Sequence, residues 1–390
     1  MRYDAIIIGA GAAGTYCAIH AAGRGLRVLL LDHNPDLGAK IRVSGGGRCN
    51  FTNTNASADT YHSHNPHFPR AALARHRSQD VLDWFGARGI TWHEKHLGQI
   101  FANQRSRGIL AALHGALTNS GATLQPATTL LEHHHDGEQF RLHTSRGDYR
   151  TPHLVIASGA PSYPKLGATD LALRIAKQHH IVNYPYRPAL VPLTLAAPPA
   201  TLAGVSHEVI IQCDGAPAFR DQLLYTHRGI SGPAVLQIST WWQRGQTLTI
   251  NPLPDLPADA LVAAKRAQPQ QTLAQFLRAH LPKAVADHLA LPYSADPLQH
   301  HSDTALSRIL HELQHRAVMP SGTEGMHKAE ACSGGIDTRE LDPKTFRVKK
   351  HPGLHFIGEA LDVTGWLGGY NLQWAWSSAW SCAQCLGETG

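Results

Sequence analysis

Cys49 carries the most reactive side chain in an unusual setting. It stands in the stretch "IRVSGGGRCNFTN", residues 41–53, where three consecutive glycines precede Arg48, Cys49 and Asn50. A thiol with an ordinary pKa of about 8.5 can give a proton to a substrate carbon at neutral pH. It can also form half of a redox disulfide, although no partner stands at a suitable spacing, or pack as a small apolar group. The sequence leaves these three roles open.

The N-terminal segment has the spacing of a phosphate-binding loop. An apolar strand over residues 5–8 leads into Gly9-x-Gly11-x-x-Gly14 and a helix, after which a second strand ends at Asp32. Gly9 permits the tight turn, Gly11 lets a pyrophosphate approach the backbone, and Gly14 brings helix against strand. The phosphates then lie at the positive end of the helix dipole. Asp32, 18 residues after Gly14, falls where a carboxylate accepts hydrogen bonds from a ribose. The pattern predicts a dinucleotide site.

The segment that follows distinguishes between dinucleotides. An NAD dehydrogenase of this layout would continue with further strand–helix units, whereas this chain continues with "DLGAKIRVSGGGRCNFTN". The glycines at 45, 46 and 47 leave bare backbone just after the ribose-binding strand. Such a loop suits a cofactor that extends beyond its pyrophosphate and lays a flat ring system along the chain. The pattern favours FAD over NAD.

The C-terminal segment supplies the other half of such a site. "GLHFIGEALDVTGWLGGYNLQWAW" predicts a strand over residues 354–357, carboxylates at Glu359 and Asp362, and a long helix beginning after Gly369. A carboxylate in this position can hold the ribityl hydroxyls. The N–H groups at the start of the helix can face the pyrimidine end of a flavin and stabilise its negative charge. The tryptophans of this segment stand at helical spacing, which indicates core packing rather than cofactor stacking.

These motifs resemble those of the YhiN/BaiN-type family of FAD-dependent flavoproteins, and most closely its YhiN branch. The resemblance runs nearly end to end and is carried by "GAGAAG", "SGGGRCNFTN", "WHEKHLGQIF", "THRGISGPAVLQIS" and "FIGEALDVTGWLGGYN". One departure lies in "ASGAPSYPK", where related proteins often have a double glycine. Ser158 and Gly159 should still contact the cofactor there.

The resemblance implies an α/β fold. It consists of a Rossmann-like (two-dinucleotide-fold) FAD domain with an inserted small β-barrel and helical cap. We expect a discontinuous FAD domain over residues 1–190 and 325–390. Short alternating strands indicate a β-barrel-like insert over 191–254, and apolar helical patterns broken by prolines indicate a helical insert over 255–324.

The motifs and the resemblance together define the expected site. We expect no metal, and the candidate proton donors are Cys49 and Tyr370. The expected cofactor contacts follow the two glycine-rich loops, the strand ends and the start of the last helix: Gly9, Ala10, Gly11, Ala13, Gly14, Asp32, His33, Lys40, Ser44, Gly45, Gly46, Gly47, Arg48, Cys49, Asn50, Leu130, Ser158, Gly159, Gly358, Glu359, Asp362, Gly369, Tyr370 and Asn371.

Composition restricts the functional class. The chain has 390 residues, 43% apolar and 16% charged, which is typical of a soluble globular protein with two or three domains. No apolar run approaches the roughly 20 residues that span a bilayer, and no signal-peptide pattern opens the chain, so we expect a cytoplasmic protein without a membrane partner. Six scattered cysteines fit a reducing compartment. Among the 27 histidines, we interpret the adjacent ones at 133–135, 179–180 and 300–301 as solvated surface, with a metal site as the minor alternative.

The resemblance implies three possible activities for the flavin. They are reduction of a uridine in large-subunit ribosomal RNA to dihydrouridine, reduction of an activated C=C bond in a small enone, and oxidation of a small amine such as aminoacetone. A non-enzymatic RNA-binding flavoprotein is a further alternative. Because no second GxGxxG is present, we expect no separate nicotinamide domain, and NAD(P)H is a possible transient electron donor.

Ribosomal RNA is the leading expectation for the substrate. The formal net charge is +6 and the pI is about 9.0, which mildly favours a polyanion over an uncharged small molecule. The oligomeric state is left open. Candidate RNA contacts are the basic residues Arg70, Arg75, Arg77, Arg105, Arg107, His227, Arg228, Lys265, Arg266, Arg278 and Lys283.

Overall fold

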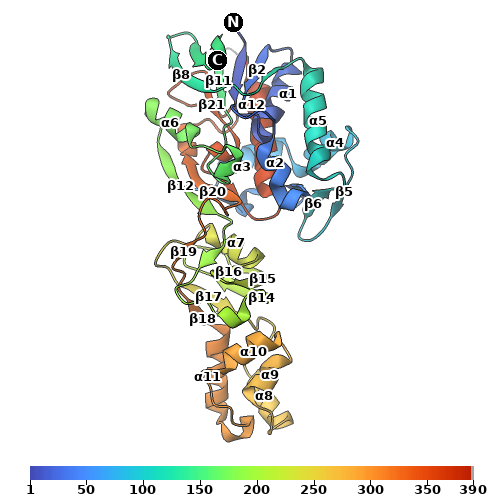
Figure 1. Cartoon of the computed structure of the whole chain (residues 1–390), viewed down its shortest axis with the longest axis vertical. Coiled ribbons are helices and arrows are strands. Elements are labelled where there is room, and N and C mark those ends of the chain that lie inside the picture. The colour runs from blue at the N-terminus through green and yellow to red at the C-terminus, as the bar shows by residue number, and fades with distance from the viewer. Residues whose placement is uncertain (388–390) are drawn as a thin grey trace. The chain divides into compact units, whose positions relative to one another are not determined.

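The computed structural model describes residues 1–387, and the chain divides into two compact units (Figure 1). One unit comprises Met1–Pro188 and the chain from Glu330 on, and the other comprises Ala189–Ala329. Each unit has its own cluster of buried apolar side chains. No helix among residues 1–387 is both long and apolar enough to cross a membrane.

A five-stranded parallel sheet forms the centre of the first unit. Its order is β21 (Leu354–Phe356), β11 (His153–Ile156), β1 (Ala5–Ile8), β2 (Val28–Leu31) and β7 (Thr123–Gln125). β1 and β2 are buried along their whole length, as expected of parallel strands covered on both faces. The carboxyl ends of parallel strands share one edge of the sheet, where ligands of such folds bind. This confirms the predicted Rossmann-like α/β class.

Three helices pack together beside this sheet. α1 (Ala12–Ala22) contacts both α12 (Tyr370–Cys385) and α5 (Arg105–Ser120) (Figure 1). α12 carries Trp374 and Trp376 on buried faces, with exposures of 1% and 0%. Their indole nitrogens donate to the carbonyls of Gly358, at 3.1 Å, and Phe51, at 2.8 Å. The predicted core role of these two tryptophans is confirmed.

Smaller sheets and helices complete the first unit. The three-stranded sheets are β10-β9-β8 and β3-β6-β5, and the two-stranded ones are β12-β20 and β22-β4. The strands are β3 (Asn50–Asn53), β4 (Tyr61–His62), β5 (Trp92–Glu94), β6 (Gln99–Ala102), β8 (Leu130–His135), β9 (Phe140–Thr144), β10 (Gly147–Thr151), β12 (Asn183–Ala189), β20 (Ala331–Ile336) and β22 (Thr364–Gly365). The helices are α2 (Ala39–Val43), α3 (Pro69–Arg75), α4 (Ser78–Gly86) and α6 (Leu171–Gln178).

The second unit combines one sheet with five helices. The sheet order is β18 (Arg316–Val318), β17 (Leu248–Asn251), β14 (Ser206–Gln212), β15 (Phe219–Thr226), β16 (Gly229–Ser231), β13 (Leu193–Thr194) and β19 (Gly322–Thr323). The helices are α7 (Pro233–Ser239), α8 (Ala260–Ala267), α9 (Leu273–Arg278), α10 (Lys283–Ala290) and α11 (Asp303–Gln314). The apolar faces of α8 to α11 form the buried cluster of this unit.

The sheet of the second unit differs from the expected barrel in two respects. Its hydrogen-bonded order runs from β18 to β19, and within residues 1–387 these two edge strands do not pair with each other. The inserted barrel is therefore not confirmed. In addition, β18 and β19 lie in the segment expected to be helical, so strands on both sides of the helices contribute to one sheet.

Candidate functional site

The loop between β1 and α1 leaves its backbone open at Gly11, the position expected to face a pyrophosphate. Gly9 has a φ of +109°, and a Cβ there would lie 2.5 Å from the carbonyl oxygen of Ala157. A Cβ on Gly14 would lie 1.8 Å from the carbonyl oxygen of Gly9. By contrast, a Cβ on Gly11 would meet no heavy atom within 4 Å. Gly9 and Gly14 are thus required by the fold itself, whereas Gly11 borders open space at the start of α1, with Ala10 and Ala13 beside it.

Asp32 closes this loop at the end of β2. Its carboxylate accepts hydrogen bonds from the backbone N–H groups of Ala10, at 2.6 Å, and Asn34, at 2.7 Å. Each carboxylate oxygen has a second acceptor position, so a ribose hydroxyl can still bind. His33, the next residue, contacts the carbonyl oxygen of Gly167 through Nε2 at 2.8 Å. The phosphate loop and the ribose-binding candidates therefore lie at one edge of the sheet.

Lys40 and Glu359 form an ion pair between segments far apart in the chain. The Lys40 ammonium lies 2.8 Å from the Glu359 carboxylate and also donates to the carbonyl oxygen of Ala160 and the hydroxyl of Ser162. The other Glu359 oxygen accepts from the backbone N–H of Cys332 at 3.0 Å. Four segments thus converge on one carboxylate, next to Gly159, whose Cβ position lies 3.7 Å from Glu359 Oε2.

The glycine-rich loop after α2 adopts backbone conformations that favour glycine. Gly45, Gly46 and Gly47 have φ values of +54°, +67° and +82°. A Cβ on Gly46 would meet nothing within 4 Å, and on Gly47 only a carbonyl oxygen at 3.8 Å. The Ser44 hydroxyl donates a hydrogen bond to the carbonyl oxygen of Ile41 at 2.8 Å. The Gly46–Gly47 surface is therefore open to a flat partner.

The residues after these glycines differ in accessibility. Arg48 is exposed and lies over the ring of Phe101, with 5.6 Å from its guanidinium carbon to the ring centroid, and Asn50 begins the buried strand β3. Cys49 has a φ of +58°, is 0% exposed and forms no disulfide. Burial raises the pKa of its thiol to about 11. As a proton donor, Cys49 would need both a path to the substrate and an environment that lowers this pKa again.

The segment from β21 to α12 carries the remaining expected contacts. Gly358 has a φ of +66°, and Gly369, with +95°, caps α12 where a Cβ would lie 2.3 Å from the carbonyl oxygen of Thr52. Asn371 uses its side chain locally, accepting from the N–H of Gly365 and donating to its carbonyl. Burial raises the pKa of Tyr370, whose residue is 6% exposed. Gly369 therefore lets the N-terminus of α12 approach β3, whereas a Cβ on Gly358 would lie 2.8 Å from the Cβ of Ala13 in α1.

Two expected cofactor contacts have buried polar atoms without a partner. Ser158 Oγ and Asp362 Oδ1 make no hydrogen bond to any group of residues 1–387. An unsatisfied buried oxygen costs about 1–3 kcal/mol, so native structures rarely keep one unless a ligand or water completes it. Together with the open Gly11 and Gly46 positions, these atoms fit a large polar cofactor along this edge of the sheet.

Two cavities lie apart from most of the expected cofactor contacts. Leu130 lines a cavity of about 210 Å³ with Leu171 and Arg174, and this cavity contains no other expected cofactor contact. A second cavity, about 1020 Å³, is an open groove over α1, α4 and α5, and its lining includes none of the expected site residues. Among the described residues, no three His, Cys, Asp or Glu side chains gather as metal ligands would.

Several polar residues of this region have no motif in the sequence that marks them. Ser162 and Cys332 contact the Lys40–Glu359 pair, His64 contacts Asp362, and Tyr184 stacks on the His64 ring. No local pattern distinguishes His64 among 27 histidines. His64 is brought to the C-terminal motif by the pairing of β4 with β22, which the sequence does not reveal.

Comparisons with known proteins identify the family of the chain. The family model described as HI0933-like protein Rossmann domain matches residues 3–385. The chain is 44% identical to a ribosomal RNA dihydrouridine synthase of Escherichia coli (99% of this chain and 98% of that protein) and 40% identical to one of Haemophilus influenzae (97% of each). It is 26% identical to a 3-dehydro-bile acid delta(4,6)-reductase of Clostridium scindens (98% of each). The chain therefore belongs to the HI0933-like family of Rossmann-fold, flavin-dependent oxidoreductases.

Proposed function

We propose that this protein reduces the C5=C6 bond of a uridine in large-subunit ribosomal RNA to give dihydrouridine, with FAD as its redox cofactor. The observation that carries the proposal is the 44% identity over 99% of the chain to a protein named for this activity. The loops at Gly11 and Gly46 support the proposal, because each leaves open backbone that a bound FAD could contact.

Each part of the cofactor has a candidate site on the chain. The N-terminus of α1 at Gly11 would hold the pyrophosphate, Asp32 the adenosine ribose, and Glu359 with Lys40 the ribityl chain. The bare backbone at Gly46 and the N-terminus of α12 would flank the flavin ring. When bound, FAD supplies hydride transfer, which no amino-acid side chain can supply. NAD(P)H is the proposed electron donor.

The chemistry of the substrate matches these elements. The uracil C5=C6 bond is conjugated with a carbonyl group, so its reduction is that of an enone: C6 accepts a hydride and C5 a proton. With the flavin ring beside the N-terminus of α12, the positive partial charge at Gly369 would stabilise the negative charge of a reduced flavin. The chain must therefore provide a proton donor and a surface for RNA.

The exposed basic residues divide into paired and unpaired sets. Arg77 is paired with Asp80, Lys265 with Asp303, and Arg278 with Asp287, at 3.4, 2.8 and 2.6 Å. The side chains of Arg70, Arg105, Arg107 and Lys283 are exposed and make no hydrogen bond or ion pair with residues 1–387. Unpaired cations can approach phosphates without first breaking an ion pair. We propose that this second set contributes most to RNA binding.

Reduction of a small enone is the second candidate. The observation that favours it is the 26% identity, over 98% of both chains, to a protein named as a bile acid reductase. The two candidates share the hydride and proton chemistry and differ in the acceptor.

Purified protein separates the two candidates. FAD-loaded protein is reduced anaerobically with NAD(P)H or dithionite and mixed with large-subunit ribosomal RNA from cells that lack the gene, or with a steroid enone. The proposal expects rapid reoxidation by the RNA and dihydrouridine in its digest by mass spectrometry. Reoxidation by the enone alone would favour the second candidate.

A further inference from the structure

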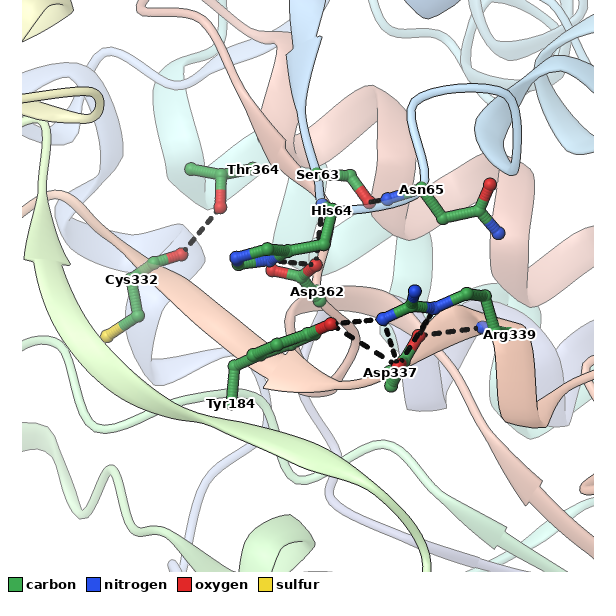
Figure 2. A network of polar contacts seen from close by, with 9 residues as sticks. All are labelled: Ser63, His64, Asn65, Tyr184, Cys332, Asp337, Arg339, Asp362 and Thr364. Atoms are coloured by element: carbon green, nitrogen blue, oxygen red, sulfur yellow. Dashed lines mark hydrogen bonds and ion pairs between the residues drawn. The ribbon is translucent and has the colours of Figure 1, made fainter. Parts of the chain in front are cut away.

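Three side chains from separate segments form a cluster in the first unit. His64 follows β4, Tyr184 lies on β12, and Asp362 lies between β21 and β22 (Figure 2). The His64 and Tyr184 rings stack with 3.8 Å between centroids and 13° between planes. The His64 ring and the Asp362 carboxylate face each other in the same view. None of the expected roles for the cofactor explains why a histidine is held here.

Asp362 fixes the histidine from two directions. One of its oxygens, Oδ2, lies 2.9 Å from His64 Nδ1 and accepts from the backbone N–H of His64 at 2.8 Å. The Asp362 side chain is 2% exposed, so its charge depends on these partners. Its other oxygen, Oδ1, is the buried atom without a partner among residues 1–387. The carboxylate thus orients the imidazole and keeps one acceptor for a bound molecule.

Tyr184 fixes the plane of the imidazole. Its hydroxyl contacts the guanidinium of Arg339 and lies 3.4 Å from Asp337, so the ring cannot turn freely (Figure 2). Burial, with the nearby Asp337 carboxylate, raises the pKa of this hydroxyl. Tyr184 therefore stays protonated at neutral pH and serves as a platform rather than a proton donor.

His64 keeps one nitrogen free. Its side chain is 44% exposed, and Nε2 makes no hydrogen bond to the described part of the chain. Because Asp362 accepts from Nδ1, a protonated ring has only Nε2–H left to donate. Imidazole is the side chain that most often gives and regains a proton in catalysis near neutral pH. Neither Cys49 nor Tyr370 combines exposure with an orienting carboxylate.

The cluster lies along the segment that joins two expected flavin contacts. Asp362 is three residues after Glu359, and the chain then passes through β22 to Gly369 at the start of α12. β22 pairs with β4, with Thr364 opposite His62, which places His64 beside this segment. The orphaned Asp362 oxygen shows that a ligand can complete the arrangement here.

We propose that His64 is the general acid that protonates the substrate, with Asp362 as its orienting partner. This inference rests on the proposed function. The hydride supplied by NAD(P)H through FAD adds to C6 of uridine, the C5=C6 π bond breaks, and C5 takes the proton from His64 Nε2. The imidazole regains a proton from water. The sum is uridine, NAD(P)H and one proton giving dihydrouridine and NAD(P)⁺.

The test compares His64→Gln with His67→Gln. His67 is an exposed histidine three residues further on, and its side chain has no partner among residues 1–387. In His64→Gln, we expect unchanged FAD affinity and unchanged reduction by NAD(P)H. Reoxidation by ribosomal RNA should slow by about 10²- to 10⁴-fold, the usual effect of losing a general acid. His67→Gln should match the wild type in all three measurements.

Two further readouts exclude a purely structural role. Imidazole in the buffer should restore part of the RNA-dependent rate of His64→Ala, which repacking alone would not allow. In the protein without cofactor, ¹⁵N–¹H NMR should show a hydrogen-bonded Nδ1–H that is absent only in the His64 variants. Wild-type-like reoxidation by RNA in His64→Gln would overturn the inference while leaving the proposed function intact. Wild-type protein that forms no dihydrouridine would overturn the proposed function and the inference together.

Discussion

Gly11 and Gly14 belong to one motif, but the structure predicts opposite consequences for their substitution. A Cβ on Gly11 would meet no heavy atom within 4 Å, and its φ of −76° suits any residue. A Cβ on Gly14 would lie 1.8 Å from the carbonyl oxygen of Gly9 and 3.1 Å from the Cβ of Ala157. Gly11→Val should therefore spare the fold and block the cofactor, whereas Gly14→Ala should damage the fold.

The magnitudes follow from what each side chain displaces. Overpacking at Gly14 should cost about 1–3 kcal/mol of unfolding free energy or more, because the obstacle is backbone. Gly11→Val should change the stability of the cofactor-free protein by no more than about 1 kcal/mol, since only a helix cap is altered. It should remove one or more charge-assisted hydrogen bonds to the pyrophosphate, each worth about 1.5–3 kcal/mol. That is roughly a 10- to 100-fold loss of FAD affinity per bond.

The assay uses cofactor-free protein throughout. Urea unfolding gives the stability of the wild type and both variants, and titration with FAD, followed by the quenching of its fluorescence, gives the affinity. Wild-type FAD affinity in a well-folded Gly11→Val protein would refute the placement of the pyrophosphate at α1. Wild-type stability of Gly14→Ala would show that the packing between the loop and α1 is looser than the structure has it.

Three other predictions concern a thiol, the RNA contacts and a buried histidine. Cys49→Ala should retain FAD binding and RNA-dependent reoxidation within about threefold, because the thiol is fully buried; a loss of 10²-fold or more in stopped-flow reoxidation would make Cys49 the proton donor instead. Arg70→Ala and Arg107→Ala should each lower the slope of log K for RNA binding against log salt concentration by about one, as measured by filter binding. Arg308 forms an ion pair with Glu312, so the control Arg308→Ala should leave this slope unchanged. Burial lowers the pKa of His355 to about 3, so the unfolded chain binds the additional proton as pH falls below about 6.5. Stability should therefore decrease with falling pH, by about 1.4 kcal/mol per unit from this residue, and His355→Gln should flatten urea-derived stability between pH 6 and pH 4; an unchanged slope would contradict the assignment.

The parts of the site that depend on local backbone could be predicted from the sequence. The Gly9–Gly14 loop, Asp32 at the end of β2 and the capping Gly369 each have a physical requirement that a neighbouring pattern reveals. The parallel sheet follows in the same way, because "AIII" and "VLLL" are strands buried on both faces. These features lie within a few residues of the pattern that specifies them.

Features that depend on long-range contact could not be predicted. Lys40 and Glu359 are 319 residues apart in the chain, and nothing in either segment indicates that they pair. His64 is oriented by Asp362 and Tyr184, which belong to segments far from it in the sequence. β18 and β19 contain three and two residues, too few for an alternating pattern to stand out beside helical neighbours. The burial of Cys49 depends on the packing of its left-handed turn and not on its neighbours in sequence.

Dihydrouridine in ribosomal RNA is the most direct measure of the central claim. Large-subunit RNA is prepared from cells with the gene, from cells without it, and from deleted cells that express either the wild type or Gly11→Val. We expect that dihydrouridine at one position disappears on deletion, returns with the wild type and does not return with Gly11→Val. Unchanged dihydrouridine in the deleted cells would contradict the assignment of RNA as substrate.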